Sequence, residues 1–369
     1  MRLTLVIPSM ERGGAERVMS ILASSWAEKG HEVTLLTLKR GVKPAHELHP
    51  DVKVRNLGLT GEPATNSLVA VFRQVARIRA LRWAIRESQP DLTISFMERT
   101  NVLTLVATKG LGVSVIVSER VDPRHYDIGP LWQRLRRLTY RWAAALVCQS
   151  RTSLMWFDQR MKVKGCVIPN PVLAVKEPAT RLPPKNAEGR TMLAMGRLVD
   201  QKGFDLLLDA FGQLAARYPD WSLVVLGEGP LRGELEARAR GLHLERQVQF
   251  AGEVPDPFPL LRAADLFVLS SRFEGFPNAL CEAMASGVAV VSFDCPSGPA
   301  EIVRHGVDGI LVPPGDVSAL VAALDVLMKD QDVRERLASR APEVVERFSR
   351  DKVLLLWEQL FKEVSSSGR

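Results

Sequence analysis

The chain has 369 residues, of which 46% are hydrophobic and 25% charged, and its formal net charge is +7. Because a domain usually takes about 100–200 residues, this length predicts two domains, and the composition excludes a disordered or fibrous chain. No run approaches the roughly 18–20 apolar residues of a membrane-spanning helix, and the first apolar run is too short for a signal peptide, so we expect a cytoplasmic protein.

The first half of the sequence predicts strands that alternate with helices. The apolar run at residues 3–7 is typical of a buried parallel strand, a helix is expected over 15–29, and Gly30 ends it before a strand at 31–37. Further strands are expected at 92–95, 113–118, 145–149 and 164–168. This alternation predicts a parallel, doubly wound sheet whose ligands bind at the carboxyl ends of the strands.

The second half repeats this pattern after a proline-rich connector at residues 171–190. Helices are expected at 204–218 and 231–240, and strands at 191–195, 222–226, 248–250, 266–269, 288–292 and 309–312. The predicted fold class is α/β, with Rossmann-like, doubly wound domains at 1–170 and 171–350 that face each other across a cleft. An amphipathic terminal helix, within 351–369, can pack back on the first domain.

The first candidate site is the glycine pair Gly13 and Gly14, between the first strand and the first helix. Glycines let the backbone approach a ligand closely, and N–H groups at a helix start favour anionic oxygens. A plain tight turn is the alternative. The segment lacks the G-x-G-x-x-G dinucleotide fingerprint, which weighs against a dehydrogenase.

The second candidate site is the segment 196–203, directly after a predicted strand of the second domain. An arginine fork and a lysine point charge, Arg197 and Lys202, can together hold a diphosphate at the carboxyl end of a strand. The alternative is a solvated basic loop.

The third candidate site, 270–287, places two carboxylates, Glu274 and Glu282, around the start of a predicted helix. Gly275 permits a tight turn and Asn278 can cap the helix. Carboxylates suit sugar hydroxyls, and the free N–H groups of a helix suit a phosphate. Both carboxylates can instead be surface charges or capping groups.

Glu274 and Glu282 are separated by seven residues, which resembles the E-x7-E signature of the family 4 retaining nucleotide-sugar glycosyltransferases with the GT-B fold. The resemblance covers nearly the whole chain. Its other motifs are GGAER at 13–17, GRL at 196–198 with Lys202, LGEGPL at 226–231, PSGPAEI at 296–302 and DGILV at 308–312.

This resemblance implies a role for each matching residue. Arg197 and Lys202 would hold the donor diphosphate and stabilise the leaving nucleotide, while Glu274 would contact sugar hydroxyls. Glu282 would bind the ribose. The backbone that supports sugar and phosphate would comprise Gly275, Phe276, Pro277, Asn278, Ala279 and Leu280, with Gly13 and Gly14 across the cleft. Family members transfer with retention on one face of the sugar, and the leaving phosphate helps to deprotonate the acceptor, so no nucleophile and base pair is expected.

One departure from the family pattern lies after the predicted strand at 113–118. Many relatives carry a histidine there, close to the sugar, whereas this chain has Arg120, with His125 five residues on. Arg99, at another predicted strand end, is a second acceptor-side candidate, weighed against a structural salt bridge.

No metal or cofactor is expected, because the GT-B family uses basic side chains and helix ends where other transferases use a divalent ion. Asp330-Gln-Asp332 has the letters of the metal-binding D-x-D motif but is not expected to bind a catalytic metal, since it lies in a polar turn between predicted helices. The cysteines lie far apart, without metal-binding spacing, and we expect reduced, mostly buried thiols: Cys148, Cys166, Cys281 and Cys295.

Basic residues are concentrated in the first half. Residues 1–170 carry 26 Lys and Arg against 14 Asp and Glu, a net +12, whereas residues 171–369 carry 23 against 28, a net −5. Such a split predicts an anionic partner for the first half, and the candidates are nucleic acid, anionic lipid and phosphorylated substrates.

Two predicted helices of the first half carry arginines at helical spacing. The first set is Arg79, Arg82 and Arg86. The second set, Arg134, Arg137 and Arg141, lies opposite an apolar stripe of Leu131, Leu135, Leu138 and Trp142. Each helix alone fits a solvated charged face equally well, but together with the net +12 they favour a peripheral membrane role.

Within the family, the sequence resembles bacterial enzymes that extend glycans on undecaprenyl diphosphate, including an N-glycan polymerase that adds N-acetylgalactosamine, and exopolysaccharide transferases. This implies sugar transfer from a UDP- or GDP-sugar to a lipid-linked glycan at the inner face of the cytoplasmic membrane. The helix that carries Arg79, Arg82 and Arg86 would bind the acceptor. The alternatives are a GT-B-like sugar-nucleotide epimerase and a nucleic-acid-binding protein that uses the basic half. The sequence predicts neither the donor sugar, the linkage nor the oligomeric state.

Overall fold

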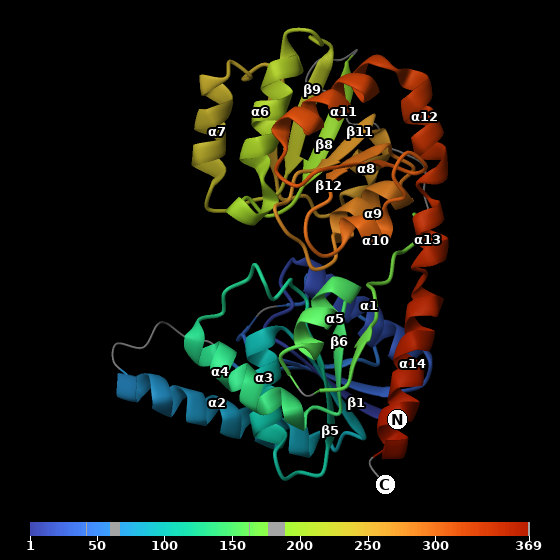
Figure 1. Ribbon diagram of the computed structural model, residues 1–369. Helices are drawn as coiled ribbons and strands as arrows, with labels where there is room; N and C mark the ends of the chain where they lie inside the picture. The colour runs from blue at the N-terminus through green and yellow to red at the C-terminus, as the bar shows by residue number, and fades with distance from the viewer. Residues whose placement is uncertain (42, 60–66, 162, 176–188, 368–369) are drawn as a thin grey trace. The chain divides into compact units, whose positions relative to one another are not determined.

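The computed structural model describes residues 1–41, 43–59, 67–161, 163–175 and 189–367 (Figure 1). It divides into two compact units. Unit 1 comprises Met1–Pro171 and Asp351–Arg369, and unit 2 comprises Val172–Arg350. The division after Pro171 lies one residue from the boundary expected from the sequence, and the terminal helix belongs to unit 1.

Unit 1 is built on a seven-stranded parallel sheet in the order β3-β2-β1-β4-β5-β6-β7. The strands are β1 (Arg2–Ile7), β2 (Glu32–Thr37), β3 (Lys53–Asn56), β4 (Leu92–Phe96), β5 (Ser114–Ser118), β6 (Ala145–Cys148) and β7 (Gly165–Val167). The helices are α1 (Gly14–Glu28), α2 (Ser67–Glu87), α3 (Glu98–Thr108), α4 (Pro130–Thr139), α5 (Arg151–Asp158) and α14 (Arg350–Ser367), with a 3-10 turn at Tyr140–Trp142.

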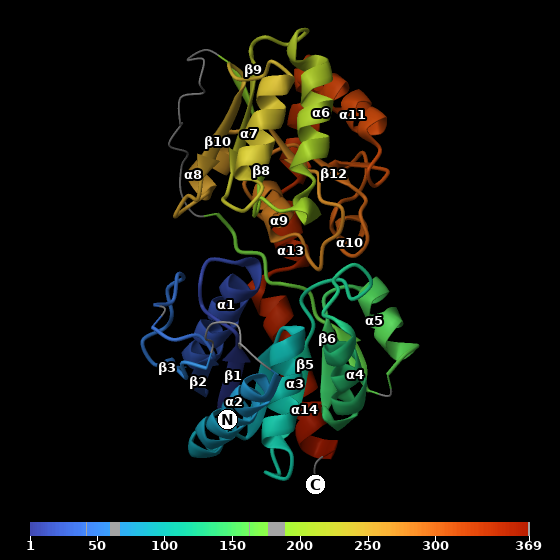
Figure 2. The same cartoon turned by 90° about the vertical axis from the view of Figure 1, so that its left-hand side faces the viewer.

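Helices cover both faces of the unit 1 sheet because its strands are apolar on both sides. On β1, Leu5 packs with α1 and α14, whereas the next residue, Val6, packs with α2 and α3. Trp26 of α1 meets Trp357 of α14 edge to face, with ring centroids 5.8 Å apart. In Figure 2, α3 and α4 lie toward the viewer and α14 lies behind the strands.

Unit 2 repeats the architecture with a six-stranded parallel sheet in the order β10-β9-β8-β11-β12-β13. The strands are β8 (Arg190–Met195), β9 (Trp221–Leu226), β10 (Val248–Gly252), β11 (Leu266–Leu269), β12 (Val290–Phe293) and β13 (Ile310–Val312). The helices are α6 (Phe204–Ala215), α7 (Arg232–Gly241), α8 (Phe258–Ala263), α9 (Asn278–Ala285), α10 (Pro299–Ile302), α11 (Val317–Lys329), α12 (Gln331–Arg340) and α13 (Glu343–Arg347), with a 3-10 turn at Asp200–Lys202.

Each sheet reverses its strand order once, between β1 and β4 in unit 1 and between β8 and β11 in unit 2. Ligands of open α/β sheets bind outside the carboxyl ends of the strands at such a switch point. The candidate residues after β8 and β11 lie at the switch point of unit 2. The glycine pair and the segment after β4 lie at that of unit 1.

The prediction of two doubly wound α/β domains is confirmed. Strand β3 was missed, because all four of its residues are at least partly exposed and it carries no apolar alternation. The prolines at 178, 183 and 184 of the predicted connector lie outside the described residues, whereas Val172 donates a backbone hydrogen bond of 2.8 Å to the carbonyl of Phe348.

Candidate active site

Lys202 and Glu274 meet at the switch point of unit 2. The Lys202 Nζ lies 2.5 Å from Oε1 of Glu274, and the hydroxyl of Ser271 donates to the same oxygen at 2.7 Å. Glu274 and Ser271 are buried and Lys202 is half-buried. Both donors therefore hold one carboxylate oxygen, which fixes the orientation of the carboxylate and directs its other oxygen away from the pair.

Tight backbone turns bring these side chains together. Gly203 has a φ of +60°, and a Cβ there would lie 2.1 Å from the carbonyl oxygen of Ser270. The hydroxyl of Ser270 donates to the carbonyl of Lys202 at 2.9 Å. A Cβ on Gly196 would lie 3.1 Å from the Lys202 Cδ, so the lysine stem packs against that glycine. Glycine at 203 is required both by its left-handed conformation and by this close approach.

Arg197 follows β8 beside Gly196 and is exposed, so its guanidinium does not join the buried Lys202–Glu274 pair. It lies on the same short connection between β8 and α6 as Lys202. The sequence thus placed both basic residues at one strand end, but only Lys202 has its charge held by Glu274.

Helix α9 begins at Asn278, so this residue is the first of the helix and does not cap it as expected. Pro277 occupies the capping position and makes no side-chain hydrogen bond there. A Cβ on Gly298, which has a φ of +137°, would lie 2.7 Å from Pro277 Cδ, so the neighbouring loop packs tightly on the helix start. Glu282 is half-buried one turn into α9, and the predicted donor-site residues before it are buried or half-buried: Gly275, Phe276, Pro277, Asn278, Ala279 and Leu280.

In unit 1, both glycines of the pair are exposed, and α1 begins at Gly14. Gly13 is extended, with a φ of −178°. A Cβ there would lie 2.3 Å from a carboxylate oxygen of Glu16, so glycine makes room for this side chain of the first turn.

Arg120 is buried directly after β5. Its Nη2 donates to Oδ1 of Asn170 at 2.9 Å, its Nη1 to the Ser118 hydroxyl at 3.3 Å, and its Cζ lies 4.0 Å from the centroid of the Phe96 ring. His125 is exposed, and its Nδ1 lies 3.5 Å from the buried carboxylate of Asp122. The position after β5 where the family pattern predicted a histidine therefore holds a buried guanidinium.

Arg99 is exposed at the start of α3. Its Cζ lies 5.6 Å from the centroid of the Trp132 ring, and its Nη2 donates to the carbonyl of Ile128 at 3.5 Å. Its neighbour Glu98 is buried, and burial raises the pKa of that carboxyl. Arg99 therefore lies against the loop before α4 rather than in a salt bridge with Glu98.

A buried pair supports this end of the unit 1 sheet. Arg136 of α4 lies 3.4 Å from Glu119, which also accepts a hydrogen bond from the Tyr140 hydroxyl. Burial raises the pKa of Glu119, and the nearby guanidinium opposes this shift. The guanidinium of Arg136 further lies 5.1 Å and 5.2 Å from the ring centroids of Trp156 and Phe157.

The arginine sets of α2 and α4 differ from the expectation. Arg82 donates to the carbonyls of Ala107 and Lys109 at the end of α3, at 2.8 and 2.7 Å, while Arg79 and Arg86 are exposed. On α2, Trp83 is 58% exposed between these two arginines. The apolar stripe of α4 mostly faces outward: Leu131 is 66% exposed, Leu138 47% and Trp142 38%, and Leu135 alone packs on the core. The side chains that face inward are those of Trp132, Leu135, Arg136 and Tyr140.

The predicted arginines of α4 and the turn after it, Arg134, Arg137 and Arg141, are exposed. Lys109 Nζ lies 4.5 Å from the centroid of the Trp142 ring. Basic and apolar side chains are therefore interleaved on this surface of unit 1, instead of lying on opposite sides of the helix.

Within the described part of the chain, no group of His, Cys, Asp or Glu side chains is arranged to hold a metal ion, and no helix is long and apolar enough to cross a membrane. Asp330 caps α12 by accepting from the backbone N–H of Val333 at 3.0 Å. All four cysteines are free thiols, and three of them are buried, as expected.

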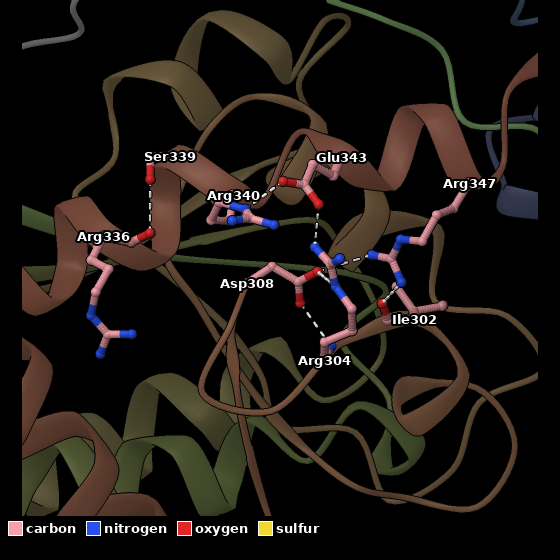
Figure 3. A network of polar contacts seen from close by, with 8 residues as sticks. All are labelled: Ile302, Arg304, Asp308, Arg336, Ser339, Arg340, Glu343 and Arg347. Carbon is pink, nitrogen blue, oxygen red and sulfur yellow. Dashed lines mark hydrogen bonds and ion pairs between the residues drawn. The ribbon is translucent and has the colours of Figure 1, made fainter.

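Asp308 of the DGILV motif joins a network of ion pairs that supports the fold of unit 2 (Figure 3). The buried carboxylate of Asp308 accepts from Arg304 Nε at 2.6 Å and from Arg347 Nη2 at 3.1 Å. Glu343 pairs with Arg304 at 2.7 Å and with Arg340. This network ties α13 to the loop before β13.

Two family models match the two units of the chain. The model of the Glycosyl transferase 4-like domain matches residues 13–171, and that of the Glycosyl transferases group 1 matches residues 176–344. The chain belongs to the glycosyltransferases. Because both matches are to transferase domains, the epimerase and nucleic-acid-binding alternatives are not supported.

Two relatives of this glycosyltransferase match over almost their full lengths. One is an α-1,4-N-acetyl-D-galactosaminyltransferase of Campylobacter jejuni, named for a GalNAc-GalNAc-diNAcBac-PP-undecaprenol substrate, with 27% identity over 100% of both chains. The other is a lipopolysaccharide core biosynthesis glycosyltransferase of Rhizobium meliloti, with 29% identity over 94% of this chain and 95% of the relative.

The glycosyltransferase also resembles a solved structure, Anabaena HepE in complex with UDP and glucose. The TM-score is 0.79 and the identity 21%, with 98% of this chain and 99% of HepE covered. The predicted GT-B fold is confirmed by this likeness.

Ser270 and Ser271 lie in the third candidate site, but the sequence alone pointed to no role for them. Both hydroxyls act on predicted donor-site residues, one on the Lys202 backbone and one on the Glu274 side chain. Their position immediately after β11 was the available signal, because a polar pair at a strand end faces the ligand side of a parallel sheet.

Proposed function

We propose that this glycosyltransferase moves a hexose, with N-acetylgalactosamine as a candidate, from a UDP- or GDP-sugar to a polyprenyl-diphosphate-linked glycan, with retention of configuration. The observation that carries the donor half of this proposal is the Lys202–Glu274–Ser271 cluster at the switch point of unit 2. The named substrate of the Campylobacter jejuni relative supports the acceptor half.

Each polar group of the donor site has a task in this proposal. Lys202, with Arg197 from the same loop, binds the diphosphate and neutralises the charge that develops on the leaving nucleotide. Glu274 accepts hydrogen bonds from the sugar hydroxyls through its second oxygen, since Lys202 and Ser271 occupy the first. Glu282 binds the ribose. These basic side chains supply the charge stabilisation, and no metal ion takes part.

The acceptor and the membrane bind to unit 1 in this proposal. Helices α2 and α4 both pack on α3, so these three helices lie on one side of the unit 1 sheet (Figure 2). Tryptophan suits the headgroup region of a bilayer, and arginine is attracted to anionic lipids. The surface formed by Arg79, Trp83, Arg86, Leu131, Arg134, Arg137, Leu138, Arg141 and Trp142 therefore fits the inner face of the cytoplasmic membrane and a lipid-linked diphosphate.

The donor half is tested by thermal unfolding with a set of nucleotide sugars. A true donor raises the melting temperature of the wild type, because a ligand that binds only the folded state stabilises it. We expect this rise to disappear in Glu274→Ala and Lys202→Ala and to persist in Glu335→Gln, whose side chain accepts a hydrogen bond from Gln331 within α12. If no nucleotide sugar stabilises the wild type, the proposal fails.

The membrane half is tested by co-sedimentation with vesicles of anionic and of neutral lipid. Arg79 and Arg86 are replaced together by glutamine, and Arg82 is kept because it holds the end of α3. We expect weaker binding to anionic vesicles and a higher KM for a lipid-diphosphate acceptor. Unchanged binding and turnover would remove these residues from the acceptor site.

A further inference from the structure

Four neighbouring strands of unit 1 each contribute a side chain to one buried polar cluster at their carboxyl ends. Phe96 ends β4, Arg120 follows β5, Gln149 follows β6, and Asn170 follows β7. Oδ1 of Asn170 accepts from Arg120 at 2.9 Å and from Gln149 Nε2 at 2.5 Å. The cluster therefore connects four strand ends around one guanidinium.

The charge of this guanidinium is poorly compensated. Arg120 is only 8% exposed, and none of the described residues places a carboxylate within ion-pair distance of it. Its partners are a hydroxyl, an amide oxygen and an aromatic ring, which are all neutral. A buried cation without an anionic partner costs free energy, so buried charges in proteins are normally paired.

Arg120 also keeps hydrogen-bonding capacity. A guanidinium has five N–H donors, and the hydrogen bonds of Arg120 engage Nη1 and Nη2, while its buried Nε has no partner. Burial lowers the pKa of Arg120 to about 9, and the attraction of Glu16 on α1 opposes this shift. The side chain therefore remains a cation at neutral pH.

Arg120 differs in its partners from Arg136, the other buried arginine at the same end of the sheet. Arg136 is paired with Glu119 and lies between aromatic rings, which accounts for its burial as a structural contact. Arg120 has the same degree of enclosure but no carboxylate, and it lies after β5, next to the strand β4 that borders the switch point. Substrates of open α/β sheets bind outside the carboxyl ends of the strands at the switch point, which β4 separates from Arg120.

We propose that Arg120 binds an anionic phosphate oxygen of a substrate at the carboxyl ends of β4 and β5. The inference rests on the proposed function, in which both the nucleotide sugar and the lipid-linked acceptor carry a diphosphate. Arginine suits this task because its planar fork matches phosphate geometry and remains charged on burial. Phe96 stacks on the guanidinium, while Asn170 and Ser118 hold its orientation.

The site is tested without turnover by using inorganic pyrophosphate as the probe. The full chain carries Arg197→Ala and Lys202→Ala, which remove the basic side chains of the proposed donor site. We expect pyrophosphate still to raise the melting temperature of this background. Adding Arg120→Gln should reduce the rise, Arg120→Lys should reduce it less, and Arg160→Gln, which changes an exposed arginine of the same unit, should keep all of it.

An absent rise in the starting background, or an equal rise with and without Arg120, would overturn the proposal. The melting temperature of each variant without pyrophosphate shows whether the fold is intact. If Arg120→Gln does not fold, the rise caused by pyrophosphate in Arg120→Lys is compared with the rise in the background instead. Lysine keeps the charge but not the planar fork, so a smaller rise supports the proposal and an equal rise overturns it. This readout remains valid if no nucleotide sugar proves to be a donor, so the two proposals fail separately.

Kinetics then identify which substrate supplies the phosphate. Losing a hydrogen bond to a charged group weakens binding by about 10–100-fold. We expect Arg120→Gln to raise the KM of the lipid-diphosphate acceptor alone if the acceptor is the source, and that of the nucleotide sugar alone if the donor is. If Arg120→Gln lowers the melting temperature and changes neither KM, Arg120 is a structural residue and the proposal is wrong.

Discussion

The carboxyl ends of the strands hold charged side chains differently in the two units. In unit 2, Lys202 is paired with Glu274, and Ser271 holds the same carboxylate. In unit 1, Arg120 is buried among neutral partners, whereas the buried Glu119 is paired deeper in the unit with Arg136. The comparison teaches that the donor-side residues hold one another in place, while the strand ends of unit 1 keep a positive charge that a phosphate would complement.

The buried pair of unit 1 should matter most for stability. Replacing Arg136 with methionine leaves Glu119 buried without its cation, and breaking a buried pair costs about 3–5 kcal/mol. We expect the unfolding transition of unit 1 to move to lower temperature in calorimetry, while that of unit 2 remains.

The matched control is Arg137→Met, the exposed neighbour on the same helix, which should change stability by no more than about 0.5 kcal/mol. Equal effects of the two variants would show that the Arg136–Glu119 pair does not support unit 1.

The largest expected effect on catalysis comes from Glu274. Replacing it with alanine removes the carboxylate that we propose contacts the sugar, and it frees the charge of Lys202. We expect kcat/KM to fall by about 100–1,000-fold, the usual effect of losing one preorganised polar group in an active site. Steady-state kinetics with the donor found by thermal shift measure this. A fall of less than about threefold would separate Glu274 from the reaction.

Ser271 should have a smaller effect on the same site. Alanine removes one of the two donors to Oε1 of Glu274 but leaves the bond from Lys202. We expect kcat/KM to fall about tenfold with little change in melting temperature, since one hydrogen bond to a charged group is lost. Ser339→Ala, whose hydroxyl bonds to the carbonyl of Arg336, is the control and should leave kcat/KM unchanged.

The smallest expected effect is a difference in pH dependence. Burial raises the pKa of Glu119 above its ordinary value of 4.5, with the charge of Arg136 opposing the shift. As the pH rises above 4.5, the unfolded state loses its proton first, so this group contributes less stability at higher pH. Thermal unfolding between about pH 4 and 7 should therefore show a larger loss in wild type than in Glu119→Gln, and parallel curves would contradict the shift.

Part of the fold and of the site follows from the sequence alone. Apolar strands alternating with helices predict doubly wound sheets, because strands buried on both faces are apolar throughout. Lys202 and Glu274 were predicted at strand ends that prove to be neighbours, because β8 and β11 pair in the sheet. Residues that follow paired parallel strands reach the same edge, which is why a local pattern predicted a contact between residues far apart in the chain.

The errors concern which side of a helix faces the protein. The stripe of Leu131, Leu138 and Trp142 is outward because Arg136 takes an inward position, where Glu119 and the rings of Trp156 and Phe157 enclose it. Arg82 likewise turns toward the carbonyls that end α3. Helical spacing gives the angle between side chains, but not the neighbour that each side chain meets, so these contacts could not be predicted.

The central claim is that unit 2 binds the nucleotide sugar through the loops after β8 and β11. Hydrogen exchange measured by mass spectrometry, with and without the stabilising nucleotide sugar, tests it most directly. We predict slower exchange in the segments 196–203 and 270–285, with the protection lost in Glu274→Ala. Hydrogen exchange that is unchanged in both segments and slower only in unit 1 would contradict the account.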